Sequence, residues 1–466
     1  MKRMKKLLTS FLACAAVCAV SVTALAAAPL ETRAAETKSY LSAANVKDGG
    51  LSEWGLISLA ASGVKGDADV IRGLIKTALE DIGENGFTGT AGAYGESAWG
   101  SNAGSLAKLI LLLNSQGISP YTFGKNGDFE GYDLVAALFN TDHYYKNVSA
   151  YDLPYALMVY DALGIPAEKE ADYKYSREML VEKCLGLIGT VDGSVLSNGT
   201  ADMTGVANVF DSTQKSPYDF ESTAMVLQAL APYYTGSKPL SGALKTELDA
   251  KVNGCIDSIK QVQTATGGVP YAFFSYDADW NASFEKYADS CDAMAQIILA
   301  FTALGIDIDT VDNGGVSMLD NFLSAEYQTG NAGEFHANTD PLTQYYNNLI
   351  TTQSAYMALA AYQEMAKNGG AAFSLFDRAA PVAYSDYDYS FFYPAQEEDS
   401  KDSAPSEPPK GPEPQEPEQQ EPESTDKAEG QKPPKVGDPF PAAGVTALLV
   451  LCGGSLFLLK RKNAGR

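Results

Sequence analysis

The sequence predicts an all-α domain over residues 36–370, in which about six helical hairpins form an inner and an outer ring, an α/α toroid. Three observations lead to this prediction. Apolar helices alternate with amphipathic helices along the chain, several of them end in the same way, and several begin in the same way. Such recurrence is typical of a fold built from one repeated unit.

One set of predicted helices carries apolar or small residues on nearly every face. A helix without a polar face is enclosed by other helices. This set comprises residues 105–115, 153–163, 222–233, 293–304 and 351–362. A second set has one polar face and alternates with the first: residues 70–82, 177–188, 244–262 and 318–325. We therefore expect the first set to form the inner ring and the second to surround it.

A glycine followed by an apolar residue marks several helix ends. The pairs are Gly63-Val64, Gly117-Ile118, Gly164-Ile165 and Gly305-Ile306. Glycine adopts the left-handed conformation that closes a helix, and the next apolar residue packs back on the last turn. The first two intervals, 54 and 47 residues, fit one helical hairpin per repeat.

The same helices begin alike, with a tyrosine just before an acidic or amide residue. The pairs are Tyr132-Asp133, Tyr151-Asp152, Tyr218-Asp219, Tyr287 with Asp289, and Tyr346-Asn347. Asp and Asn accept hydrogen bonds from the first free amides of a helix and favour the positive end of its dipole. We expect Asp133 to open a short outer helix and the others to open inner helices.

Several of these segments resemble prenyltransferase and squalene-cyclase repeats. They are residues 222–234, 263–268, 295–305, and 327–335 followed by 352–362. The resemblance covers most of residues 50–366 and is closest to uncharacterised surface proteins of gut-type Gram-positive bacteria. The toroid of cobalamin carriers, such as intrinsic factor and transcobalamin, is similar too. The resemblance implies a toroid of the terpenoid cyclase and protein prenyltransferase type, and similarity between repeats carries little information on function.

The two ends of the chain predict export and anchoring. A basic cluster from Lys2 to Lys6, an apolar run and Ala24-Leu25-Ala26 are typical of a secretory signal over residues 1–26, with cleavage after Ala35 as an alternative. A membrane anchor is predicted at residues 440–459, because residues 442–459 carry no charge and span about 27 Å as a helix. The basic tail, residues 460–466, is expected in the cytoplasm.

Residues 371–396 are predicted to extend the toroid, and residues 397–438 to form a linker. In the linker glutamates alternate with prolines, a composition that stays extended and buries nothing. It contributes to a formal net charge of −24, which makes nucleic acid an unsuitable partner.

A degenerate sorting motif precedes the anchor. Pro434 and Gly437 match the frame of the sortase signal of Gram-positive wall proteins, whereas Pro433 and Val436 replace the leucine and threonine of that signal. Covalent attachment by a sortase and simple membrane anchoring therefore both stay open.

The cysteines do not predict a disulfide framework. Cys14 and Cys18 lie in the signal and Cys452 in the anchor, which leaves Cys184, Cys255 and Cys291 in the body of the protein. An odd number allows one disulfide at most, and three buried thiols are the preferred interpretation.

The predicted ligand site is the opening at which the inner helices begin. Its rim comprises Tyr151, Asp152, Tyr218, Asp219, Glu221, Tyr287, Asp289, Tyr346 and Asn347, with Asp292 as a further carboxylate. Tyrosine faces suit sugars or flat ligands, and paired carboxylates serve glycoside hydrolysis. Helix capping next to core tyrosines is the alternative, preferred for each position taken singly.

The catalytic motifs of enzymes with a similar fold are incomplete. Asp277-Ala278-Asp279-Trp280 lacks the last aspartate of the cyclase acid motif, and Asp386-Tyr387-Asp388 follows the toroid. Asp289 and Cys291 resemble two zinc ligands of prenyltransferases, but His336 lies in the loop before the helix at which the third ligand is expected. We therefore expect Asp289 to cap a helix and Cys291 to pack in the core.

Calcium is a weaker candidate at Asp277, Asp279 and Asn281. Their alternation resembles an EF-hand loop, but Ala282 replaces the turn glycine. A solvated acidic loop is the preferred interpretation, so no metal is assigned. The sequence identifies no cofactor.

Three functions remain open. The first is a surface-anchored, non-catalytic module that binds a small molecule or glycan in the toroid, with a corrinoid implied by the carrier resemblance. The second is a surface glycosidase or polysaccharide lyase. The third is a structural wall spacer. The incomplete motifs favour binding over catalysis.

Overall fold

The computed structural model describes residues 30–45, 51–87, 99–146, 149–196, 202–208, 217–276, 282–324, 331–336, 348–377 and 381–393. The predicted signal, linker, anchor, basic tail and sorting residues Pro434 and Gly437 lie outside these ranges, as do Asp277, Asp279, Asn281, Tyr346 and Asn347. Within the described ranges, no helix is both long enough and apolar enough to span a bilayer.

The described chain is mostly helical. Helices buried on nearly all faces, here called the inner helices, are α2 (Glu53–Ala61), α4 (Ala103–Gln116), α6 (Leu153–Ala162), α9 (Phe220–Thr235), α11 (Cys291–Ala303) and α13 (Asn348–Lys367). Between them come α3 (Ala68–Asn85), α5 (Leu134–Asn140), α7 (Ala167–Glu170), α8 (Arg177–Leu187), α10 (Gly242–Gln261) and α12 (Met318–Phe322). The apolar and amphipathic segments named from the sequence therefore do form helices.

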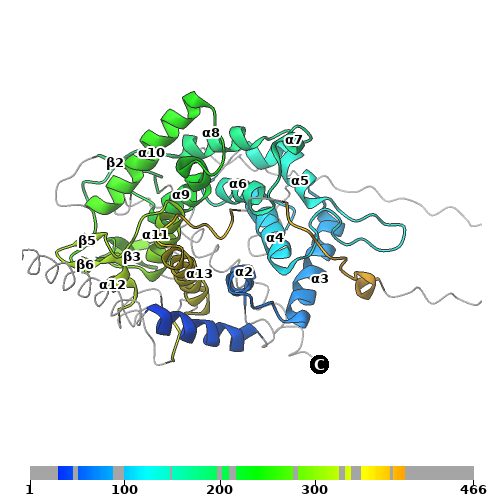
Figure 1. Cartoon of the computed structure of the whole chain (residues 1–466), viewed down its shortest axis with the longest axis horizontal. Coiled ribbons are helices and arrows are strands. Elements are labelled where there is room, and N and C mark those ends of the chain that lie inside the picture. The colour runs from blue at the N-terminus through cyan, green and yellow to red at the C-terminus, as the bar shows by residue number, and fades with distance from the viewer. Residues whose placement is uncertain are drawn as a thin grey trace, which may run out of the picture.

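The inner helices contact one another in chain order. Helix α2 contacts α4, α4 contacts α6, α6 contacts α9, α9 contacts α11, and α11 contacts α13, which contacts α2 in turn. Figure 1 shows these helices around a common centre, with α3, α5, α8 and α10 farther out. The outer helices pack on them, α5 on α4, α8 on α6 and α9, α10 on α9, and α12 on α11.

The predicted glycine helix ends are confirmed. Gly63, Gly117, Gly164 and Gly305 have φ angles of 77°, 77°, 60° and 75°. The amide of the residue after each glycine donates to a carbonyl five residues earlier, as from Ile118 to Leu113 at 2.9 Å and from Ile306 to Phe301 at 2.8 Å. This bond belongs to the Schellman motif, which satisfies the last carbonyls of a helix.

Short antiparallel hairpins, which the sequence analysis did not predict, connect some of the helices. They pair β1 (Gly189–Asp192) with β2 (Asp202–Gly205), β3 (Tyr271–Tyr276) with β4 (Ala282–Ala288), and β5 (Asp312–Asn313) with β6 (Val316–Ser317). Tyr287 pairs with Ala272 in the second hairpin, so it lies in a strand and does not stand at a helix start as predicted. Aromatic residues favour a pleated, half-buried strand, which accounts for the difference.

The domain begins earlier than predicted. A helix covers residues 30–45, whereas the sequence placed the domain boundary at residue 36. Arg33 in this helix is 5% exposed, donates from Nη2 to the carbonyl of Glu334 at 2.9 Å, and lies 4.1 Å from the ring centroid of Phe335. Residues 30–35 are therefore part of the packed domain.

Residues 371–377 and 381–393 cross the end of the domain at which the inner helices terminate. The amide of Phe373 donates to Thr302 in the last turn of α11 at 3.0 Å. Farther along, Tyr384 donates to Asn114 near the end of α4 at 2.9 Å, and Ser385 forms a parallel bridge with Ile118. Figure 1 shows this segment in orange over the helices.

The predicted thiols are also confirmed. Cys184, Cys255 and Cys291 are free and buried. Burial raises the pKa of all three, so each side chain is a neutral core residue.

Candidate functional site

The candidate site lies at the beginning of α9 and α11. Asp219 is the N-cap of α9, as predicted: its Oδ1 accepts from the amide of Ser222 at 2.9 Å, and its Oδ2 from the Ser222 hydroxyl at 2.6 Å. The hydroxyl of Tyr151, just before α6, also donates to Oδ2 of Asp219 at 3.3 Å. Two of the predicted rim residues, from neighbouring inner helices, are therefore in contact.

Glu221 and Asp292 add two further carboxyl groups to this end of the domain. Burial raises the pKa of Glu221 well above its usual value, and the negative charges of Asp292 and Asp219 raise it further. Burial raises the pKa of Asp292 to about 6, although the Thr351 hydroxyl donates to its Oδ2 at 3.1 Å. These carboxyl groups act on one another, so their titration is coupled.

One face of α9 carries the contacts to its inner neighbours. Glu221, Met225 and Gln228 follow at spacings of four and three residues on α9, which places them on one side of the helix. Gln228 donates from Nε2 to Oε1 of Gln296 on α11 at 2.9 Å, and the hydroxyl of Tyr155 on α6 lies 2.8 Å from Sδ of Met225. The inward face of α9 thus meets both of its inner neighbours.

Aromatic rings from α2, α6 and the C-terminal segment lie together. The ring centroids of Trp54 on α2 and Tyr155 on α6 are 5.0 Å apart, although α4 lies between these helices in the order of contacts. Phe376, from the C-terminal segment, meets Trp54 edge to face at 6.4 Å. The predicted rim does not include Trp54, Tyr155 or Phe376. Only the spacing of Tyr155, four residues after Tyr151, indicates in the sequence that its side chain shares a helix face with a rim residue.

Asp152 joins the starts of two inner helices. Although it is the N-cap of α6, its carboxylate makes no capping bond to that helix in the described structure. It accepts instead from the hydroxyl of Ser149 at 2.5 Å and from the amide of Gly104 in the first turn of α4. Burial raises its pKa, and these two hydrogen bonds oppose the effect.

Tyr218 is a core residue and does not lie at a rim as predicted. Its side chain is fully buried, and its hydroxyl donates to the carbonyl of Thr204 on β2 at 3.1 Å. The ring rests on Gly205, where a Cβ would lie 2.3 Å from it. The physical reason is the β1–β2 hairpin, which covers the tyrosine and which the sequence did not predict.

Asp289 does not cap α11, which corrects the sequence prediction. The N-cap is Ser290, whose Oγ accepts from the amide of Ala293 at 3.4 Å. The carboxylate of Asp289 accepts instead from Thr264 at 3.0 Å, from Thr266, and from Asn321 at 2.9 Å. These donors come from elsewhere in the chain and together outcompete the local amide.

The residues that resemble zinc ligands are not gathered in the described structure. Cys291 is fully buried, whereas Asp289 is engaged with the hydroxyl groups just named, and His336 is half-buried in the loop before α13. Among the described residues, no group of three His, Cys, Asp or Glu side chains is arranged to hold a metal ion.

Two clefts on the described surface lie away from these carboxyl groups. One, of about 550 Å³, lies between residues 119–127 and 384–390. The other, of about 420 Å³, lies between the helix of residues 30–45 and the ends of α2 and α13. The predicted rim residues do not line either cleft.

Comparison with known proteins gives no relative. No protein-family model, curated protein or solved structure matches this chain.

Proposed function

We propose that this chain is an exported, surface-anchored binding protein whose helical domain is an α/α toroid and holds a ligand in its interior. The toroid is supported by the order of contacts among the inner helices, which returns from α13 to α2, and by the outer helices packed around them. Export and anchoring rest on the signal and anchor predicted from the sequence. Signal cleavage after Ala26 rather than Ala35 keeps the buried Arg33 in the mature protein.

The observation that carries the binding proposal is the gathering of Asp219, Glu221 and Asp292 beside Tyr151 where α9 and α11 begin. The largest charges acting on Glu221 are themselves negative, so its carboxyl group gains from a ligand that donates hydrogen bonds. Sugars offer many hydroxyl donors, and the rings of Trp54 and Tyr155 offer apolar faces for a sugar ring. We therefore propose a glycan as the ligand.

Calorimetric titration of the full-length chain in detergent with a panel of bacterial and dietary glycans tests this proposal. We expect micromolar binding of at least one glycan, weakened ten-fold or more in Glu221→Gln and in Asp292→Asn. The matched control is Asp257→Asn on the exposed face of α10, which should bind as the parent does. Binding that is the same in all variants would place the glycan elsewhere.

Equilibrium dialysis with cyanocobalamin tests the corrinoid alternative from the carrier resemblance. Corrinoid binding without glycan binding would replace the proposed ligand class. Absence of both at micromolar protein would favour a structural wall spacer.

A second function, a surface glycosidase, is favoured by the presence of two buried carboxyl groups, Glu221 and Asp292, at the start of neighbouring helices. Burial raises the pKa of both, and glycoside hydrolysis uses a pair of carboxyl groups of which the acid has a raised pKa. Release of reducing ends from a polysaccharide by the parent, lost in both Glu221→Gln and Asp292→Asn, would establish catalysis. Binding without release leaves the protein a binding module.

A further inference from the structure

The larger of the two described clefts, of about 550 Å³, lies between the C-terminal segment and the loop of residues 119–127. This loop follows the end of α4, whereas Glu221 and Asp292 lie where α9 and α11 begin. The cleft is therefore separate from those carboxyl groups. Its volume lies within the range of about 300–1,000 Å³ that is usual for ligand sites.

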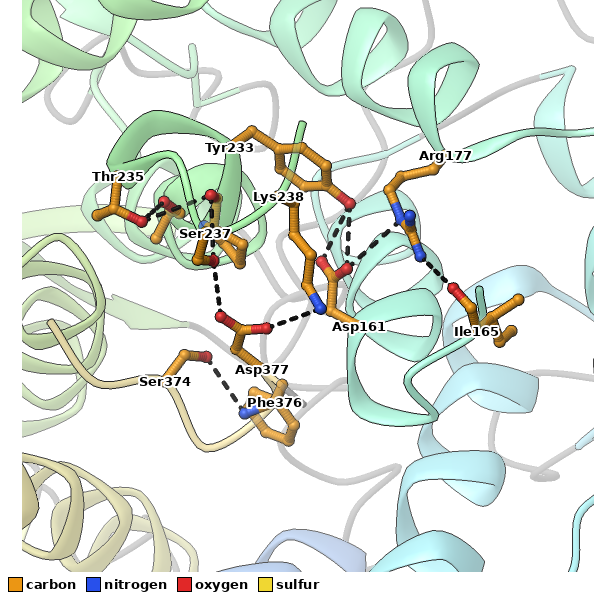
Figure 2. Close-up of polar contacts among 12 residues, drawn as sticks. Asp161, Ile165, Arg177, Tyr233, Thr235, Ser237, Lys238, Ser374, Phe376 and Asp377 are labelled. Carbon is orange, nitrogen blue, oxygen red and sulfur yellow. Dashed lines mark hydrogen bonds and ion pairs between the residues drawn. The ribbon is translucent and has the colours of Figure 1, made fainter. Parts of the chain in front are cut away.

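Asp377 fastens the beginning of the C-terminal segment to the end of α9. Its carboxylate pairs with Nζ of Lys238 at 3.1 Å and accepts from the hydroxyl of Ser237 at 2.8 Å, and Figure 2 shows both contacts. The two charged side chains are only 14% and 25% exposed, so solvent screens the pair less than a surface ion pair. The segment thus has a fixed start before it reaches the cleft.

The two walls of the cleft are joined to each other at two places along the segment. Ser385 forms a parallel bridge with Ile118, and farther on the hydroxyl of Tyr393 donates to the carbonyl of Gly124 at 3.2 Å. A cleft whose walls are already tied together needs little ordering when a ligand binds, which favours affinity.

Tyrosine rings on the C-terminal segment line the cleft and are held by other rings. Tyr389 is buried and meets Phe123 edge to face at 5.9 Å, and Tyr387 meets Tyr389 edge to face at 4.8 Å. Tyr384 meets Tyr121 in the same way at 6.2 Å. Tyr384 and Tyr387 are half-buried, so part of each ring stays accessible.

Apart from these tyrosines, the lining that the structure describes is polar and carries no aliphatic side chain. The loop contributes Ser119, Thr122 and Asn126, and the C-terminal segment contributes Ser385. Their hydroxyl and amide groups both donate and accept hydrogen bonds. Accessible aromatic faces among such groups suit a sugar chain, whose rings have apolar faces edged by hydroxyl groups.

The charges along the cleft select against an anionic ligand. Among the described lining residues, Lys125 is the cation and is paired with Glu130 at 3.2 Å, whereas Asp386 and Asp388 are exposed carboxylates. Hydrogen bonds from the hydroxyl and the amide of Ser390 lower the pKa of Asp388, so this group is ionised. An anionic chain would therefore meet net repulsion, and a neutral chain would not.

We propose that this cleft is a second ligand site and that it binds a neutral sugar chain. The site is independent of the proposed interior ligand. Sugar rings stack on the accessible parts of Tyr384 and Tyr387, and sugar hydroxyl groups bond to Asn126 and Asp386. Two sources supply such chains, the N-acetylated glycan of a bacterial wall and hexose glycans from the surroundings.

Calorimetric titration of the full-length chain in detergent with chitohexaose and with cellohexaose tests the site. We expect micromolar binding of at least one hexaose, weakened at least ten-fold in Tyr387→Leu and at least three-fold in Asp386→Ala. Leucine keeps an apolar contact to Tyr389 without a flat ring, and Asp386 is exposed, so both variants should stay folded. Tighter binding of chitohexaose would identify the wall glycan as the source, and tighter binding of cellohexaose the hexose glycans.

The matched control is Phe391→Ala, which removes a ring of the same segment that is 67% exposed and lies outside the lining of the cleft. It should bind as the parent does. Unchanged binding in Tyr387→Leu, or no binding of either hexaose by the parent, would overturn the proposal. Equal affinity for the 6-carboxylated form of the bound hexaose would also overturn it, because the charges would then select nothing.

Hydrogen exchange separates this site from the proposed interior site. A saturating hexaose should slow the exchange of backbone amides in residues 119–127 and 384–390 at least three-fold. Protection confined to the first turns of α9 and α11, with binding lost in Glu221→Gln, would support the proposed function and overturn the second site. Binding lost in Tyr387→Leu and kept in Glu221→Gln would do the opposite. If both sites bind, each variant removes one of two binding events.

Discussion

Trp54 and Tyr155 lie with their ring centroids 5.0 Å apart, although they belong to helices α2 and α6, which α4 separates in the order of contacts. Their meeting requires both rings to project toward the centre shared by the inner helices. The same centre receives Phe376 from a segment more than 200 residues away in the chain. Rings from α2, α6 and the C-terminal segment therefore meet in one aromatic cluster.

Trp54 should report on the interior by fluorescence. We expect a bound interior ligand to shift or quench the emission of the parent, because it changes the surroundings of the half-buried indole. In Trp54→Phe the remaining signal from Trp99 and Trp280 should not respond. An identical response in that variant would show that the ligand binds away from Trp54.

Removing the cap of α9 should weaken the domain. Asp219→Ala loses the hydrogen bonds from Ser222 and Tyr151, so we expect the free energy of unfolding to fall by about 1–2 kcal/mol. Asp219→Asn keeps a capping oxygen and should lose less than half as much. Urea unfolding measures the free energy of unfolding of both variants. Equal losses would mean that the charge of Asp219, rather than its capping oxygen, stabilises the domain.

Asp161 should make stability depend on pH. Burial raises its pKa to about 7, whereas the unfolded value is near 3.8. The folded protein therefore holds a proton that the unfolded chain releases. The stabilisation of the folded state by this proton is complete below about pH 4 and is lost as the pH rises through 7. The rise in the pKa of Asp161 is limited by Arg177, Lys238 and Tyr233 and increased by the negative charge of Asp377.

Asp161→Asn should remove that dependence, since the amide does not titrate. The free energy of unfolding of the variant minus that of the parent should increase by up to about 4 kcal/mol from pH 4 to pH 8, at about 1.4 kcal/mol per pKa unit. Urea titrations across this range measure the difference. Parallel pH curves for the two proteins would show that Asp161 is ionised at all these pH values.

Gly268 and Gly73 should respond oppositely to alanine. A Cβ at Gly268 would lie 2.3 Å from Cγ of Asp289 and would displace the carboxylate from Thr264 and Asn321, with an expected loss of about 1–3 kcal/mol. At Gly73, on the exposed face of α3, nothing lies within 4 Å. There alanine should add about 0.5–1 kcal/mol through helix propensity. Thermal unfolding of both variants gives the two signs.

Local signals in the sequence were sufficient for the helices and their ends. The absence of a polar face predicted the burial of α4, α6, α9, α11 and α13, and the glycine-apolar pairs predicted the left-handed closures, because both depend on residues within one or two turns. The cap at Asp219 was predictable for the same reason.

The amino-acid sequence by itself determined a mostly helical domain, its alternation of buried and half-exposed helices, and three buried thiols. Only the tertiary structure decided which polar and aromatic groups meet. Asp289 accepts from hydroxyl and amide donors elsewhere in the chain and does not cap α11. Tyr218 is covered by a hairpin, and the rings of Tyr155 and Phe376 both meet that of Trp54. These outcomes depend on competition among partners distant in sequence, which no local pattern records.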